Sequence, residues 1–90
     1  MVRILVVGTA DTKGEELAFL GQVVGEAGGT ALIVDVGIGT PSIPVGVTNS
    51  TVASHDLTAP SLLGTNDRGP AVAAMGRAFR AFLAGYGEIG

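Results

Sequence analysis

Four consecutive apolar residues, Ile4–Val7, lead into a turn of small residues that carries one lysine, Lys13. An unbroken apolar run suits a strand that is buried on both faces, as strands are in a parallel sheet. Open α/β sheets bind their ligands at the carboxyl ends of such strands. Residues 8–14 lack bulky side chains and add hydroxyls at Thr9 and Thr12, so backbone N–H groups and a cation can approach a ligand closely. The sequence therefore predicts a phosphate-binding or nucleotide-binding loop.

The first 35 residues have the pattern of one strand–helix–strand unit. Strands are expected at Arg3–Gly8 and Thr30–Asp35. The helix between them is expected to begin at Thr12, whose hydroxyl would form a capping box with Glu15, and to end at the glycine pair after residue 27. A unit of this length joins two parallel strands by a right-handed crossover. The buried face of the helix is expected to hold Leu17, Leu20, Val24 and Ala27, with Phe19 and Val23 beside it.

The second half of the chain is less regular. Glycines and prolines interrupt Val36–Asp67, where only residues 48–54 suggest a short helical turn. A second helix is expected from Gly69 or Pro70 to Ala84, with Asn66 or Asp67 as its N-cap. Residues 88–90 would begin a third strand. The expected buried stripe of the second helix is Val72, Met75, Phe79, Phe82 and Leu83, the outward residues are Arg77 and Arg80, and the closing glycines are Gly85 and Gly87.

Composition limits the size of the fold. The chain has 90 residues, of which 47 % are hydrophobic and 14 % charged, so it is expected to form one packed domain rather than a disordered segment. Two strands and two helices leave such a sheet incompletely covered. We therefore expect a truncated α/β domain, a Rossmann-like three-layer parallel sheet of order β-α-β-long loop-α-start of a third strand. The rest of its own protein, or a second copy in a homo-oligomer, would complete it.

Charge and residue types argue against several functional classes. The net charge is −3 and the five basic residues are scattered, unlike a nucleic-acid-binding surface. With no cysteine and one histidine, neither a thiolate metal site nor a zinc site is expected. No apolar run approaches the roughly 20 residues of a membrane span, and the first residues fit a strand better than a signal peptide. A cytoplasmic protein that binds neither nucleic acid nor membranes is expected.

Two cations, Lys13 and Arg68, stand at expected helix starts, where the helix dipole disfavours positive charge unless an anion is nearby. Each lies next to a glycine that would let a ligand approach. The Gly8–Lys13 segment matches neither the P-loop nor the dinucleotide-binding glycine motif, so a tight turn with a solvated Lys13 is the alternative. For Arg68 the alternative is a salt bridge to Asp67 or Asp35. The nucleotide hypothesis requires the two cations to share one cleft.

Four further polar residues have two interpretations each. Asp35 ends the second strand, where an acid can accept ribose hydroxyls or serve as a turn residue. Asp11 can hold a metal ion through water or cap the first helix. The adjacent His55 and Asp56 resemble a catalytic pair, but no nucleophile accompanies them, so we expect a surface histidine. The sequence identifies no catalytic residue and leaves enzymatic activity open.

Three segments resemble the Tm-one-like ATP-binding family, named after a tomato mosaic virus resistance protein. They are Gly8–Leu20, Val34–Gly37, and Asp67–Gly69 followed by Ala71–Met75. Members of that family, which include uncharacterised bacterial proteins, are far longer, with an N-terminal Rossmann-like domain that binds ATP and a C-terminal α/β barrel-like domain. The resemblance implies that residues 1–90 are the N-terminal part of the nucleotide-binding domain, without the glycine-rich segment that follows the third strand.

By this resemblance the chain is an ATP-binding module of a larger protein, and whether a magnesium ion accompanies ATP stays open. Lys13 or Arg68 would contact phosphate oxygens, and an acid would orient magnesium or ribose. The alternatives are a protein-interaction element and part of an enzyme whose catalytic residues lie in the C-terminal region. The residues implied to bind ATP are Gly8, Thr9, Ala10, Asp11, Thr12, Lys13, Asp35, Val36, Gly37, Asp67 and Arg68.

Overall fold

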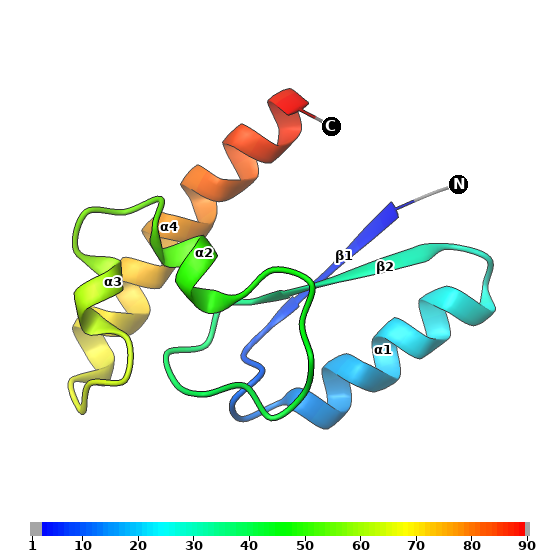
Figure 1. Cartoon of the computed structure of the whole chain (residues 1–90), viewed down its shortest axis with the longest axis horizontal. Helices are drawn as coiled ribbons and strands as arrows, with labels where there is room; N and C mark the ends of the chain where they lie inside the picture. The colour runs from blue at the N-terminus through cyan, green and yellow to red at the C-terminus, as the bar shows by residue number, and fades with distance from the viewer. Residues whose placement is uncertain (1–2, 90) are drawn as a thin grey trace.

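The computed structural model describes residues 3–89 as a two-stranded parallel sheet with helices on both faces (Figure 1). The strands pair in register from Arg3 opposite Thr30 to Gly8 opposite Asp35. This confirms the predicted α/β class and the bounds of both strands. The elements in chain order are β1 (Arg3–Gly8), α1 (Gly14–Glu26), β2 (Thr30–Asp35), α2 (Asn49–Ala53), α3 (Ala59–Leu62) and α4 (Arg68–Ile89).

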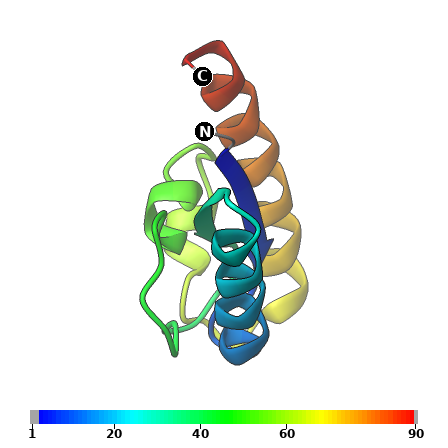
Figure 2. The ribbon, with the colours of Figure 1, turned by 90° about the vertical axis from the view of Figure 1, so that its right-hand side faces the viewer.

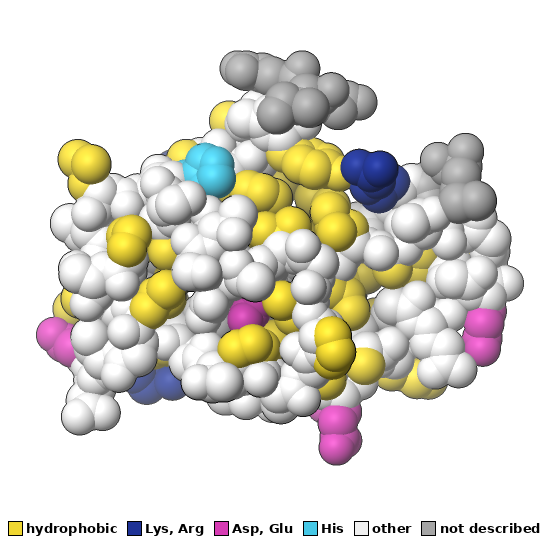
Figure 3. Space-filling model, viewed as in Figure 1, with side chains coloured by type: hydrophobic (Ala, Val, Ile, Leu, Met, Phe, Trp, Pro, Cys, Tyr) yellow, Lys and Arg dark blue, Asp and Glu magenta, His cyan; other side chains and the backbone are white. Residues whose placement is uncertain are grey.

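Each face of the sheet has its own hydrophobic core. Side chains alternate between the two faces of a strand, so Val6 packs under α1 with Ala10 and Leu17, while Leu5 packs toward the other helices. The core on that second face is the larger one, and alanines at buried positions of α4 allow α2 and α3 to approach it closely. Its buried residues are Val34, Ile38, Val52, Ala53, Ala59, Ala71, Ala74, Met75, Ala78 and Phe82. Figure 3 shows hydrophobic side chains in the middle of one face and charged ones mostly at its rim.

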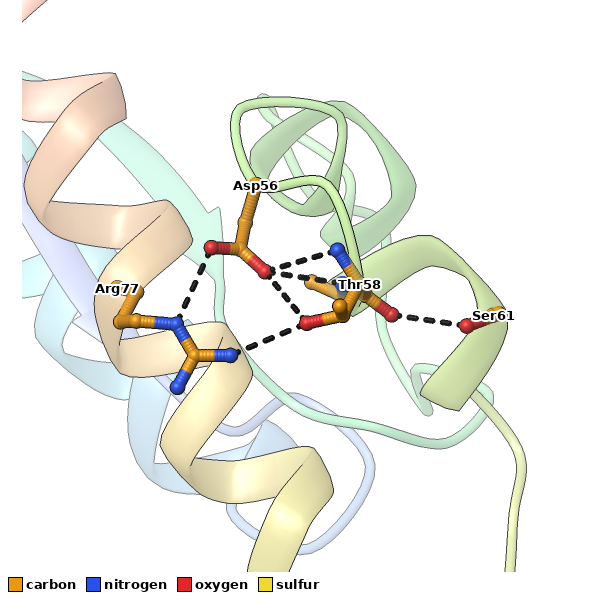
Figure 4. Close-up of polar contacts among 5 residues, drawn as sticks. Asp56, Thr58, Ser61 and Arg77 are labelled. Carbon is orange, nitrogen blue, oxygen red and sulfur yellow. Dashed lines mark hydrogen bonds and ion pairs between the residues drawn. The ribbon is translucent and has the colours of Figure 1, made fainter.

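A polar cluster ties α4 to the segment before α3 (Figure 4). Arg77 Nε donates to Asp56 Oδ1 at 3.2 Å, and Arg77 Nη2 donates to Thr58 Oγ1 at 3.1 Å. The other oxygen of Asp56 accepts from Thr58 N, Thr58 Oγ1 and Ala59 N, which caps α3. The hydroxyl of Thr58 and then the guanidinium of Arg77 lower the pKa of Asp56 to about 2.

The contacts of His55 are structural and do not involve Asp56. Its ring packs edge-on against Phe82, with centroids 5.5 Å apart, and its Nδ1 lies 3.1 Å from the Thr51 carbonyl oxygen. His55 is exposed, as predicted. Both residues of the apparent catalytic pair therefore help to hold α2, α3 and α4 together.

The predicted start of α1 is wrong. The helix begins at Gly14, the N-cap residue is Lys13, and no side chain caps it. The Thr12 hydroxyl lies 2.8 Å from that of Thr9 and is engaged there, so it forms no capping box with Glu15. The predicted end is confirmed, because Gly28 takes a φ of +90° that suits glycine at a helix terminus.

The apolar faces of both long helices are buried less than predicted. On α1 only Leu17 of the expected stripe is buried, whereas Phe19, Leu20 and Val23 are 64 %, 49 % and 42 % exposed. On α4 Met75 and Phe82 are buried, but Val72 and Leu83 are 54 % and 39 % exposed. A sheet of two strands is too narrow to cover the full width of these helices.

Two further expectations for the second half are wrong. α4 begins at Arg68 and continues to Ile89, through Gly85 and Gly87, which were expected to end it. The third strand therefore does not begin at residues 88–89, and Gly90 lies outside the described residues. The short helix α3 was not expected, whereas α2 agrees with the helical turn predicted at residues 48–54.

Candidate functional site

The loops that follow β1 and β2 are held together by one buried carboxylate. Asp35 is fully buried, and its Oδ1 accepts hydrogen bonds from Ala10 N at 3.0 Å and Gly37 N at 2.8 Å. Val36 N also donates to Gly8 O at 2.9 Å, which continues the pairing of the strands into these loops. Asp35 therefore fixes the carboxyl ends of both strands relative to each other, in agreement with its interpretation as a turn residue.

A second loop covers the start of α1. Ser42 donates to the Ala10 carbonyl oxygen from both its N and its Oγ, at 2.9 and 3.0 Å. Gly14 is buried beneath it, and a Cβ at Gly14 would lie 2.1 Å from Ser42 Oγ. The first turn of α1 is thus packed against residues 42–43. The predicted phosphate cradle is not open on this side of the β1–α1 loop.

Lys13 points away from that loop into solvent. Its side chain is 68 % exposed, and its Nζ lies 3.9 Å from Glu16 Oε2, which is also largely exposed. Exposed ion pairs of this kind contribute little to stability. The requirement that Lys13 and Arg68 share one cleft is not met, because Lys13 does not line the cleft described next. The nucleotide hypothesis in its two-cation form is therefore wrong, and only a form in which Arg68 is the single cation remains.

A cleft of about 220 Å³ opens between the β1–α1 loop, the segment after β2 and the first half of α4. Most of its wall is apolar and comes from Val36, Ile38, Val72, Met75 and Phe79. Its polar side chains are those of Thr9, Asp11 and Arg68, and its glycines are Gly37 and Gly76. The cleft lies at the carboxyl end of β1, where open α/β sheets bind ligands.

Asp11 is wedged against glycines at the inner end of the cleft. A Cβ at Gly37 would lie 2.5 Å from Asp11 Oδ1, and one at Gly39 would lie 2.9 Å from Asp11 Oδ2. Glycine at these two positions is therefore what lets the carboxylate fit. Asp11 Oδ1 is buried and has no hydrogen-bond partner among the described residues. A buried acceptor without a donor is costly, so a donor group from a ligand would be favoured there.

Arg68 supplies a positive charge to the same cleft. It is the first residue of α4, it is exposed, and the described residues give its guanidinium no hydrogen-bond or ion-pair partner. The predicted alternative, a salt bridge from Arg68 to Asp67 or Asp35, is not formed. The N-terminus of α4 adds the partial positive charge of the helix dipole. An anionic group at this end of the cleft would be attracted by both the Arg68 guanidinium and the N-terminus of α4.

The structure brings together five of the eleven residues implied to bind ATP: Thr9, Asp11, Val36, Gly37 and Arg68 line the cleft. The other six lie outside its lining: Gly8, Ala10, Thr12, Lys13, Asp35 and Asp67. Gly8, Ala10 and Asp35 support the loops from beneath through the contacts given above. Thr12, Lys13 and Asp67 are exposed.

Five cleft residues were not predicted as site residues, namely Ile38, Val72, Met75, Gly76 and Phe79. Three of them, Val72, Met75 and Phe79, were assigned to the buried stripe of the second helix. Their spacing identifies the apolar face of the helix, but it does not show whether that face packs in a core or lines a cleft. Gly76 was the available signal, because a glycine inside a helix costs stability and can therefore have a packing or functional reason.

Comparison with known proteins decides the family. Residues 2–88 match the family model described as the N-terminal domain of an uncharacterised protein family, UPF0261. The chain belongs to the UPF0261 family. A UPF0261 protein of Rhizobium meliloti is 50 % identical over 90 residues, and one of Mesorhizobium japonicum is 49 % identical. The predicted membership of the Tm-one-like ATP-binding family is wrong, because the matching model and these relatives carry the UPF0261 description instead.

The chain spans about a quarter of the length of these relatives. The match covers 99 % of this chain but 23 % of each of the two proteins, and a Brucella suis relative, 34 % identical, is covered to 22 %. This agrees with the prediction that such a domain is part of a larger protein. No solved structure shows a significant match to the chain.

Residues 3–89 show neither a membrane-spanning helix nor a cluster of metal ligands. Across this part of the chain no helix combines the length and hydropathy that a membrane span needs. Nor do the acidic and histidine side chains described gather in groups of three or more that could hold a metal ion.

Proposed function

We propose that this UPF0261 domain is a Rossmann-like nucleotide-binding module and that the cleft beside α4 holds part of a nucleotide, with ATP as the ligand. The supporting observation is the combination in one cleft of an unpaired cation, Arg68, a buried unpaired acceptor, Asp11 Oδ1, and an apolar wall. A nucleotide carries the complementary groups: phosphates, hydrogen-bond donors and a flat ring that packs on apolar side chains.

The polarity of the cleft suggests how the ligand lies. Its phosphates face Arg68 and the N-terminus of α4, where positive charge and N–H groups coincide. Its ring lies against Val72, Met75 and Phe79, the apolar wall on the same helix. A ligand donor meets Asp11 at the glycine-lined end. In this arrangement Lys13 makes no contact, which departs from the expectation drawn from the sequence.

The size of the cleft limits what it holds alone. Ligand pockets usually measure about 300–1,000 Å³, whereas this cleft measures about 220 Å³. It therefore accommodates one portion of a nucleotide, and the remainder contacts parts of the longer protein. Whether the whole protein is an enzyme stays a prediction, since most of each relative lies outside this domain.

Substituting the two cations separately tests this proposal. ATP binding is measured by isothermal titration calorimetry for the wild type, Arg68→Ala and Lys13→Ala. A hydrogen bond to a charged group contributes about 1.5–3 kcal/mol, so Arg68→Ala should weaken binding by roughly tenfold or more. Lys13→Ala should change affinity little.

The matched control is Arg80→Ala, because Arg80 is also an exposed arginine on α4 but does not line the cleft. It should bind ATP like the wild type. Equal affinity for Arg68→Ala and Arg80→Ala would contradict the proposal. So would the absence of ATP binding in the full-length Rhizobium meliloti relative.

A further inference from the structure

The outer edge of β1 carries main-chain groups for which residues 3–89 provide no strand partner. The carbonyl of Gly8 accepts a hydrogen bond from Val36 N, so Gly8 directs its main-chain groups toward β2. Residues along a strand direct these groups alternately to the two edges. Arg3, Leu5 and Val7 therefore direct theirs to the opposite edge. Within residues 3–89 no strand pairs with that edge, since the sheet consists of β1 and β2.

The outer edge of β2, by contrast, is covered at its carboxyl end. Val47 N donates to Ile33 O at 2.9 Å, Asp35 N donates to Val47 O at 3.0 Å, and Val34 forms a parallel bridge with Val47. The segment before α2 thus occupies this edge. The two edges therefore differ at the carboxyl ends of the strands, next to the cleft, where the edge of β1 is the open one.

Apolar side chains border the open edge on the α1 face. Gly21 of α1 faces β2, because a Cβ at Gly21 would lie 3.5 Å from Ile33 Cδ1. Leu20 and Val23 therefore lie on the other flank of α1, toward the open edge, and they are 49 % and 42 % exposed. Ile4 lies on the same face of β1 as the buried Val6 and is 42 % exposed. These three side chains form an uncovered apolar strip.

A second apolar strip borders the open edge on the α4 face. Figure 2 shows α4 running alongside β1. Val72, Leu83 and Tyr86 share one side of α4 by their spacing, and Arg3 Nη1 donates to the Tyr86 hydroxyl at 3.0 Å. Val72 and Leu83 are 54 % and 39 % exposed, and Val7 is 38 % exposed. A strand placed beside β1 would be covered by apolar side chains on both faces.

The two helices specify the direction of that strand. Strand–helix–strand connections are right-handed in about 98 % of cases. The step from β1 to β2 has its helix, α1, on one face, and α4 lies on the opposite face (Figure 1). If the connection that contains α4 is also right-handed, the strand that follows α4 must lie beside β1, on the side away from β2. The end of α4 also lies by the amino end of β1, through Tyr86 and Arg3, which is where a strand parallel to β1 would begin.

We propose that the open edge of β1 receives a third, parallel strand from the residues that follow this domain in the full-length protein. The family model describes an N-terminal domain, and the relatives are about four times as long as this chain, so residues follow it there. The strand is a continuous apolar run, as expected for one covered on both faces. Its carboxyl end emerges beside the cleft.

Amide hydrogen exchange tests this docking without any nucleotide, so its outcome is independent of the proposed ligand. Exchange is compared between the full-length Rhizobium meliloti relative and this 90-residue chain. In the relative, amides aligned with Leu5 and Val7 should exchange about as slowly as those aligned with Val6 and Gly8, which face β2. In the 90-residue chain, Leu5 and Val7 should exchange at least about tenfold faster than Val6 and Gly8.

Three results decide the matter. Protection of the outer-edge amides in the relative, with β2-facing amides as the internal reference, supports the docked strand even if the 90-residue chain proves unfolded. Fast exchange of the outer-edge amides in the relative overturns it. Protection of the outer-edge amides in the relative that disappears on dilution also overturns it, because a second copy then occupies the edge.

Discussion

Substitution of Asp35 tests whether its carboxylate stabilises the fold or binds a ligand. Its Oδ1 accepts from Ala10 N and Gly37 N inside the protein, and its Oδ2 has no partner among the described residues. Asp35→Ala leaves two buried N–H groups without an acceptor. Each costs about 1–3 kcal/mol, so the expected loss is about 2–6 kcal/mol. A chain of 90 residues has a free energy of unfolding of about 5–13 kcal/mol, so the loss is a large fraction of it.

Asp35→Asn is the matched variant. Its side-chain oxygen can accept both hydrogen bonds, and its amide group takes the place of the oxygen that has no partner. The substitution also removes a buried charge, whose desolvation opposes folding. We therefore expect Asp35→Asn to lose less than half of what Asp35→Ala loses.

Urea unfolding followed by far-ultraviolet circular dichroism measures both variants. With a slope of about 1–3 kcal/mol per molar urea, Asp35→Ala should shift the midpoint by about 1 M or more. Equal stability of Asp35→Ala and the wild type, within about 0.5 kcal/mol, would refute the reasoning. A folded Asp35→Asn that no longer binds ATP would instead restore the ribose-binding interpretation, because Asp35 does not line the cleft.

Two other perturbations follow from the structure. Hydrogen bonds from Thr58 and Arg77 lower the pKa of Asp56 from 3.8 to about 2, so the stability that this carboxylate contributes is present above pH 3.8 and is lost as the pH falls toward 2. Asp56→Asn should therefore flatten the pH dependence of the unfolding midpoint between pH 4 and pH 2, and an unchanged slope would count against this cluster. Gly76→Ala and Gly85→Ala should each stabilise α4 by about 0.5–1 kcal/mol in urea unfolding, since neither Cβ meets an atom within 4 Å. Gly76→Leu should in addition block ATP, whereas Gly85→Leu should not, and equal binding by the two leucine variants would argue against the cleft.

The strands were predictable because their signal is local. The apolar runs of Arg3–Gly8 and Thr30–Asp35 have the length and composition of strands, and the structure confirms both bounds. The expected burial on both faces is not seen within residues 3–89, where Ile4 and Val7 are 42 % and 38 % exposed. The end of α1 was equally local, since two consecutive glycines leave few alternatives. The start of α1 was not, because Thr12 could bond either the helix end or the neighbouring Thr9, and the tight turn favours Thr9.

The candidate site was only partly predictable because its parts come from distant segments. Arg68 and Asp11 were found through their positions at a helix start and after a strand. Val72 and Phe79 were assigned to a core because spacing shows which side of a helix is apolar and not what that side contacts. The length of α4 was also missed, since glycines within a helix lower its propensity without ending it.

Val72 belongs both to the proposed nucleotide cleft and to the surface beside the open edge of β1. A strand docked at that edge would cover part of Val72 and extend the wall of a cleft that is smaller than most ligand pockets. ATP should then bind more tightly to a full-length UPF0261 protein than to this 90-residue chain. Equal affinities, with the outer-edge amides protected in the longer protein, would mean that the strand completes the sheet without contributing to the ligand site.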